Sequence, residues 1–145
     1  MKKLHYTIDI KASREIVWKT LWDEATFHDW ASLIDEGTYM QGIMKEGSEV
    51  QFISSTNGYG VTSFIEKLIV NEYVLFKHQA DTIEHGQDIR EIEWTGGTES
   101  YHLIDKDDKT ELIIWLDVPL HQEETFNERV PRALYRVKEL SEEIS

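Results

Sequence analysis

The sequence contains no cysteine among its 145 residues. This absence excludes a disulfide framework, a thiolate nucleophile and a thiolate metal site. No stretch approaches the roughly 18 consecutive apolar residues that a membrane-spanning helix needs. Residues 1 to 10 include two lysines, but they hold neither a long apolar run nor a small-residue cleavage site. We therefore expect no signal peptide and a cytoplasmic protein.

Positive charge is scarce relative to negative charge. The chain has 15 Lys and Arg against 28 Asp and Glu, a formal net charge of −13 at pH 7. An acidic surface repels phosphate groups, so we expect neither nucleic-acid binding nor binding to anionic membranes. The charge favours cationic or neutral ligands without naming one.

Several motifs of catalysis and cofactor binding are missing as well. The sequence has no GxSxG nucleophile motif and no HExxH, and its glycines are scattered instead of forming a phosphate-binding loop. Its six histidines include no close pair at metal-binding spacing. We expect no nucleotide, no metal ion, no other cofactor and no nucleophilic acyl transfer.

The length fits one domain over residues 1–145, because no repeat, linker or low-complexity tract divides the chain. Hydrophobic residues make up 40% of the sequence, enough for a core without covalent staples. Aromatic residues make up 11% and include five tryptophans. These rings either fill a small core or line a pocket, and both interpretations stay open.

The first third of the chain predicts a strand followed by two helices. Apolar and polar residues alternate from Leu4 to Ile10, which is typical of a half-buried strand. Ser13 is placed to cap a helix whose apolar residues recur at i, i+4 spacing up to Trp22. A second short helix is expected from Glu24 to Trp30.

From about residue 38 the pattern changes to strands, which we expect over residues 38–42, 48–54, 61–70, 73–78, 99–104 and 110–118. In the fourth of these, an outward Lys77 places Val74, Phe76 and His78 inward by parity. Residues 81–98 are the least regular part. A short helix and an extended lid are both compatible with that segment.

A long helix is predicted at the end of the chain by apolar residues at 3.6-residue spacing, namely Phe126, Val130, Leu134, Val137 and Leu140. Pro131 lies within this stripe. Either the helix starts at Glu123 and kinks at Pro131, or Pro131 lies near the first helical position. Only this helix is long enough to cover the apolar face of an antiparallel sheet. The predicted class is α+β, with a curved sheet of about six to seven strands wrapped around the helix.

This order of elements is the helix-grip order, and the local sequence agrees with it. Residues 8–30 resemble the START-like (SRPBCC) pattern, with matches at Ala12, Val17, Trp18, Leu21 and Trp30. Residues 72–78, 94–103, 110–118 and 124–143 resemble the branch named for the activator of the Hsp90 ATPase. The matches there are Trp94, Glu99, Tyr101, Leu112, Phe126, Pro131, Ala133, Leu134 and Lys138.

The resemblance implies a deep cavity between the sheet and the long helix. It does not imply one activity, because the superfamily includes lipid carriers, hormone receptors and polyketide cyclases. Chaperone activation belongs to larger members with an additional N-terminal domain, so the resemblance carries the fold without that role. The residues expected to line the cavity are Trp18, Trp30, Phe52, Phe64, Phe76, His78, Trp94, Glu99, Tyr101, Phe126, Val130 and Leu134.

Three functions stay open on these residues. The first is binding of an apolar or amphipathic small molecule oriented by His78, Glu99 and Tyr101. The second is a cyclase-like or dehydratase-like enzyme with Glu99 or His78 as acid or base. A structural carboxylate that orients Tyr101 is the alternative for Glu99, and a register shift of one residue would place it in solvent. The third is a protein-interaction module that modulates a chaperone or another protein partner and uses the acidic surface. The sequence leaves the ligand and the oligomeric state undetermined.

Overall fold

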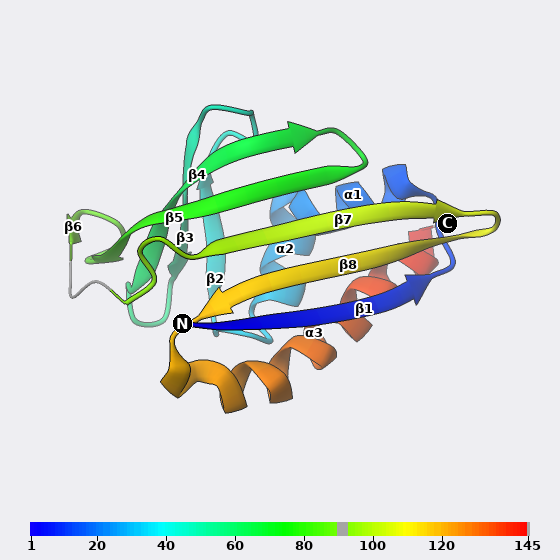
Figure 1. The fold of residues 1–145 in the computed structure, drawn as a ribbon. Coiled ribbons are helices and arrows are strands. Elements are labelled where there is room, and N and C mark those ends of the chain that lie inside the picture. The colour runs from blue at the N-terminus through cyan, green and yellow to red at the C-terminus, as the bar shows by residue number, and fades with distance from the viewer. Residues whose placement is uncertain (90–92, 145) are drawn as a thin grey trace.

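The computed structural model describes residues 1–89 and 93–144 (Figure 1). In chain order the elements are β1 (Lys2–Ile10), α1 (Arg14–Trp22), α2 (Glu24–Ala31), β2 (Thr38–Gly42), β3 (Glu49–Ser54), β4 (Gly60–Ile69), β5 (Tyr73–Ile83), β6 (Asp88–Ile89), β7 (Thr98–Lys106), β8 (Lys109–Val118), the 3-10 helix η1 (Leu120–Gln122) and α3 (Glu123–Ile144). This confirms the α+β class and the helix-grip architecture that the sequence predicts.

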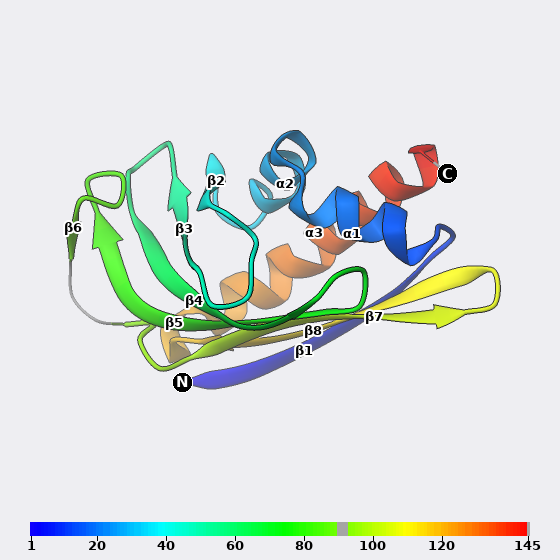
Figure 2. The same cartoon turned by 90° about the horizontal axis from the view of Figure 1, so that it is seen from above.

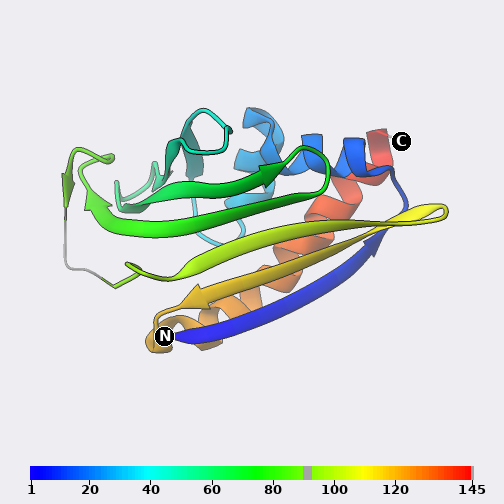
Figure 3. The ribbon, with the colours of Figure 1, turned by 45° about the horizontal axis from the view of Figure 1, so that its top comes forward.

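The strands form one antiparallel sheet in the order β1-β8-β7-β5-β4-β3-β2, and β6 pairs with β5 beside this path. The sheet curves so that β2 and β3 rise toward α2, while α3 crosses its concave side (Figure 2). Figure 3 shows that α3 starts next to the N-terminal end of β1 and runs along the sheet toward the opposite end. The concave side of the sheet, covered by the three helices, therefore holds the core.

Helix boundaries follow local chemistry. The Ser13 hydroxyl caps α1 by accepting a hydrogen bond from the Ile16 N–H at 3.3 Å. Helix α3 begins at Glu123 and continues through Pro131 to Ile144, so the first of the two alternatives for this proline is right about the start. Pro131 has no N–H to donate to the carbonyl of Asn127. The Asn127 side chain is tied elsewhere, since its Oδ1 accepts a hydrogen bond from the Tyr6 hydroxyl at 2.5 Å.

The core consists of the inward residues of the strands and the apolar stripe of α3. Val74, Phe76 and His78 have 0%, 0% and 3% of their surface exposed, which confirms the parity predicted for this strand. An aromatic cluster lies at the centre of this core. The Trp22 ring packs against five others, those of Trp18, Phe27, Trp30, Phe76 and Tyr101.

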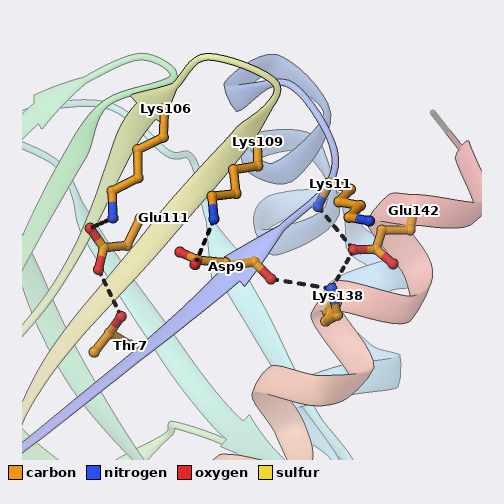
Figure 4. A network of polar contacts seen from close by, with 8 residues as sticks. All are labelled: Thr7, Asp9, Lys11, Lys106, Lys109, Glu111, Lys138 and Glu142. Carbon is orange, nitrogen blue, oxygen red and sulfur yellow. Dashed lines mark hydrogen bonds and ion pairs between the residues drawn. The ribbon is translucent and has the colours of Figure 1, made fainter.

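A polar network ties the C-terminal turns of α3 to the end of β1 (Figure 4). The Lys138 ammonium donates to the Asp9 carbonyl at 3.2 Å and to the Glu142 carboxylate at 2.5 Å. Glu142 also accepts a hydrogen bond from the Lys11 N–H at 2.9 Å. The last turns of the helix are acidic, and Lys138 gives Glu142 a positive partner there, which stabilises the ordered end.

The segment at 81–98 contains no helix in its described residues. Strand β5 extends to Ile83, five residues beyond the predicted end at residue 78, and a turn leads into the short β6. The longer strand was missed because Asp81 and Thr82 interrupt the apolar alternation although both are buried. Residues 90–92 of the predicted helix or lid lie outside the described residues.

Candidate functional site

A pocket of about 490 Å³ lies at one end of the concave face, beside the first turns of α3. One group of residues forms its floor and four groups form its walls. The floor is made by inward residues of β5, β7 and β8, namely His78, Glu99, Tyr101 and Leu116. The walls come from α2 and the segment after it (Phe27, Trp30, Ala31, Ile34, Asp35, Thr38), from the β3–β4 hairpin (Phe52, Asn57, Tyr59, Gly60, Val61), from η1 and α3 (Gln122, Thr125, Phe126, Arg129) and from the turn before β7 (Glu93, Trp94).

The pocket brings together seven of the twelve residues expected at a cavity: Trp30, Phe52, His78, Trp94, Glu99, Tyr101 and Phe126. Their role in binding stays a prediction. Phe76, Val130 and Leu134 are buried core residues outside the pocket lining. Trp18 also lies outside it, half-buried on α1 with its ring 6.2 Å from that of Trp22.

Phe64 is a correction, because it lies on the opposite face of the sheet. It pairs in register with Glu49 and Lys77, which are both exposed, whereas its neighbours Ser63 and Ile65 are fully buried. Phe64 and Ile65 are both apolar, so hydrophobicity alone does not say which of them faces inward. Irregular pairing of β4 with β5 on both sides of this pair further weakens a prediction from parity.

Glu99 and Tyr101 form a hydrogen-bonded pair on the floor. They are two residues apart on β7, so the pleat of the strand places both side chains on the concave face. The Tyr101 hydroxyl donates to Glu99 Oε2 at 2.8 Å. Burial raises the pKa of Glu99 to about 7, although the hydrogen bond from Tyr101 acts in the opposite direction. Burial, together with the nearby Glu99, also raises the pKa of Tyr101 well above its usual value.

His78 lies on the same floor as a neutral side chain. Its Nδ1 is 2.7 Å from the Ser63 hydroxyl. Its ring is nearly perpendicular to the Trp94 ring, with 6.0 Å between the two ring centroids. Burial lowers the pKa of His78 to about 4, although the negative charges of Asp117 and Asp81 partly oppose this shift. An uncharged imidazole at neutral pH is suited to hydrogen bonding and does not supply a positive charge to the pocket.

Asp81 positions the turn that carries Trp94, and sequence reasoning missed it. The two carboxylate oxygens of Asp81 accept hydrogen bonds from the backbone N–H groups of Glu93 at 3.0 Å and Trp94 at 2.9 Å. The Trp94 ring packs against the Phe126 ring, with 5.6 Å between the two ring centroids. This contact joins the sheet to α3 across the pocket. A fully buried aspartate needs such partners. The Asp within the strand was therefore the sequence feature that could have indicated this contact.

Sequence reasoning also missed the side chains that loops and helix ends bring to the pocket, such as Tyr59 and Arg129. Arg129 is exposed, and its Nη1 donates to the Ile34 carbonyl at 3.0 Å, which ties α3 to the end of α2.

Among the described residues, no cluster of His, Asp and Glu side chains is arranged to hold a metal ion. Within the same part of the chain, no helix is both long and apolar enough to cross a membrane.

Solved structures are similar to this chain over nearly its whole length. The Aha1 dimer from Colwellia psychrerythraea, solved in solution, is 21% identical with a TM-score of 0.74, covering 98% of this chain and 97% of that one. Protein MLL2253 from Mesorhizobium loti is 10% identical with a TM-score of 0.76 and covers 99% of both chains. DynU16, from the dynemicin biosynthetic locus, is 10% identical with a TM-score of 0.69, covering 96% of this chain and 46% of its own.

This chain has the START-like helix-grip fold. The fold that the resemblance implies is thus confirmed. No family model matches the sequence, and no curated protein matches it. Sequence identities of 10% to 21% carry the fold and leave activity and ligand to the site itself.

Proposed function

We propose that this protein binds an apolar or amphipathic small molecule in the pocket between the sheet and the N-terminal turns of α3. One observation carries the proposal: the Glu99–Tyr101 pair lies on the floor of a pocket of about 490 Å³ with aromatic walls. A carboxyl group buried in a fully packed core would only cost free energy. A pocket of this volume that combines aromatic walls with polar groups at its floor is of the kind that holds small ligands.

The walls supply the binding free energy and the floor supplies orientation. The rings of Trp30, Phe52, Trp94 and Phe126 offer apolar surface around the ligand. Burying apolar surface stabilises a complex by roughly 25 cal/mol per Å² before the costs of association are subtracted. The Glu99 carboxyl and the Tyr101 hydroxyl then select the polar end of the molecule.

A second candidate function is proton transfer by Glu99 on a bound substrate. A carboxyl group with a pKa of about 7 accepts and returns protons near neutral pH, as a cyclase or dehydratase requires. The two functions separate in the variant Glu99→Gln. An enzyme would lose turnover in this variant, whereas a binding protein would keep its affinity for a neutral ligand.

Native mass spectrometry of the protein purified from its host tests the first proposal. We expect a stoichiometric apolar adduct, which solvent extraction then identifies. The adduct should be lost in Trp94→Ala, which removes a pocket wall, and kept in Trp115→Ala. Trp115 is a matched control because it lies on the outer face, stacked on His5 and 42% exposed.

A ligand that dissociates during purification would leave no adduct. In that case, saturable binding of aromatic probes, measured by tryptophan fluorescence, tests the proposal. Trp30 and Trp94 both line the pocket, so occupation should change the emission. A wild-type protein with no adduct and no saturable probe binding would contradict the proposal.

A further inference from the structure

We propose that the pocket floor is a subsite for a protonated amine, so that the ligand is an aromatic or aliphatic amine whose ammonium group contacts Glu99. This inference rests on the proposed function and names the ligand class for the same pocket. It follows from an account of the hydrogen-bond acceptors, the donors and the charges that line the pocket.

The floor has acceptor capacity to spare. An ionised carboxylate offers about four lone-pair positions on its two oxygens. Among the described residues, the hydrogen bond from Tyr101 to Oε2 is the one side-chain hydrogen bond that Glu99 receives. The Glu99 side chain keeps accessible surface, and that surface faces the pocket. A group with several N–H donors is complementary to the remaining positions.

Two side-chain donors near the floor are already engaged within the protein. The Tyr101 hydroxyl donates to Glu99, and the Trp30 indole N–H donates to the Leu21 carbonyl at 3.1 Å. His78 Nδ1 is engaged with the Ser63 hydroxyl. A carboxylate or phosphate head group would place a second negative charge beside the Glu99 carboxylate, which is unfavourable in a desolvated site.

The charges that line the pocket point the same way. Among the described residues that line the pocket, Asp35, Glu93 and Glu99 are acidic and Arg129 is basic. Arg129 is exposed and donates to the Ile34 carbonyl, so its charge lies toward solvent. His78 is neutral at pH 7. The potential at the floor is therefore negative, and a cationic head group gains most from it.

Three probes that share one naphthalene ring and one exocyclic carbon test the inference: 2-naphthylmethylamine, 2-naphthylmethanol and 2-naphthoate. We expect isothermal titration calorimetry at pH 8 and fixed ionic strength to give the order amine, alcohol, carboxylate from tightest to weakest. The amine should bind at least about tenfold more tightly than the carboxylate, as expected for one charge-assisted hydrogen bond. In Glu99→Gln the amine should lose about tenfold in affinity, and the alcohol less than about threefold.

Glu93→Gln is the matched control, because it removes the same charge from the wall of the same pocket. The Glu93 carboxylate lies 3.6 Å from His121 Nε2 and is one-third exposed, so a smaller loss of amine affinity, about twofold, is expected. An equal loss in Glu93→Gln and Glu99→Gln would overturn the inference, since the preference would then come from the acidic surface. If Glu99→Gln fails to fold, the wild-type protein decides: its amine affinity should rise between pH 6 and pH 8 relative to that of the alcohol, and a constant ratio would overturn the inference.

The carboxylate probe separates failure of this inference from failure of the proposed function. Tight binding of 2-naphthoate that Arg129→Gln abolishes would place the head group at Arg129, which overturns the amine subsite and leaves ligand binding in place. Absence of binding for all three probes would overturn both.

Discussion

The Tyr101 hydroxyl donates a 2.8 Å hydrogen bond to the Glu99 carboxylate two residues earlier on β7. This bond stabilises the ionised form of the carboxyl group and so limits the rise in pKa that burial causes, which brings the pKa to about 7. The pair thus sets the charge of the pocket floor near neutral pH.

The first prediction concerns this hydrogen bond. Tyr101→Phe removes the donor, so the pKa of Glu99 should rise further above 7, by roughly one unit or more. A carbon-13 NMR titration of glutamate side chains measures this directly. Tyr135→Phe, at an exposed position on α3, should leave the titration unchanged. A Glu99 pKa that falls or stays constant in Tyr101→Phe would show that the bond has no such effect.

The second prediction concerns the pH dependence of stability, to which Glu99 and His78 contribute with opposite signs. The pKa of Glu99 is higher in the folded state than its ordinary 4.5, so the folded protein binds more protons and loses stability as pH rises from 4.5 to about 7. The pKa of His78 is lower than its ordinary 6.5, so stability rises between about pH 4 and 6.5. Each contribution is at most about 3 kcal/mol, and the two largely cancel between pH 4.5 and 6.5.

Urea unfolding from pH 4 to pH 8 separates these contributions. Relative to wild type, Glu99→Gln should show a free energy of unfolding that rises more steeply with pH, because only the His78 contribution remains. His78→Gln should show the reverse, a steeper fall. Curves for both variants that run parallel to that of the wild type would refute the two pKa shifts together.

The third prediction compares two phenylalanines on neighbouring strands that face opposite ways. Phe76 is fully buried, with its ring against those of Trp22 at 5.5 Å and Phe52 at 5.2 Å. Phe76→Ala should reduce the free energy of unfolding by about 3 to 5 kcal/mol, because it leaves a cavity in the core. Phe64→Ala on the outer face should cost about 1 kcal/mol. Denaturant unfolding measures both values. Equal losses of unfolding free energy in the two variants would contradict the assignment of Phe76 to the inner face and Phe64 to the outer face.

The fourth prediction concerns Asp81 and the turn that it holds. Asp81→Asn replaces one acceptor oxygen with an NH2 group, which should cost about 2 kcal/mol of stability. Hydrogen exchange of the Glu93 and Trp94 amides, followed by NMR, should accelerate more than that of the β1–β8 ladder. Asp108→Asn, at an exposed hairpin position, serves as the control with unchanged exchange at both amides. Unchanged exchange in Asp81→Asn would mean that other contacts position Trp94.

Much of the fold was accessible from sequence because its signals are local. Alternation of apolar residues predicts β1 and β8, Ser13 predicts the start of α1, and the 3.6-residue stripe predicts α3. The same local signal fails where it is ambiguous. The wrong inward assignment of Phe64 arose because Phe64 and its neighbour are both apolar and lie in an irregularly paired strand. The extension of β5 was missed because it contains polar residues whose partners are distant in sequence.

The candidate site was predictable in part, for the same reason. Strand parity places Glu99 and Tyr101 on the same face of their strand and His78 on the inward face of its own, but no local pattern indicates that Asp81 binds the amides of Glu93 and Trp94. Likewise, Arg129 reaches the pocket only because α3 docks against the end of α2.

The sequence by itself determined the order of elements, the inward face of most strands and the acidic character of the chain, since periodicity and composition are properties of short segments. Tertiary structure alone decided the outward face of Phe64, the depth of Glu99 and the neutrality of His78. Those features depend on desolvation and on contacts between residues far apart along the chain, and a one-dimensional pattern does not contain them.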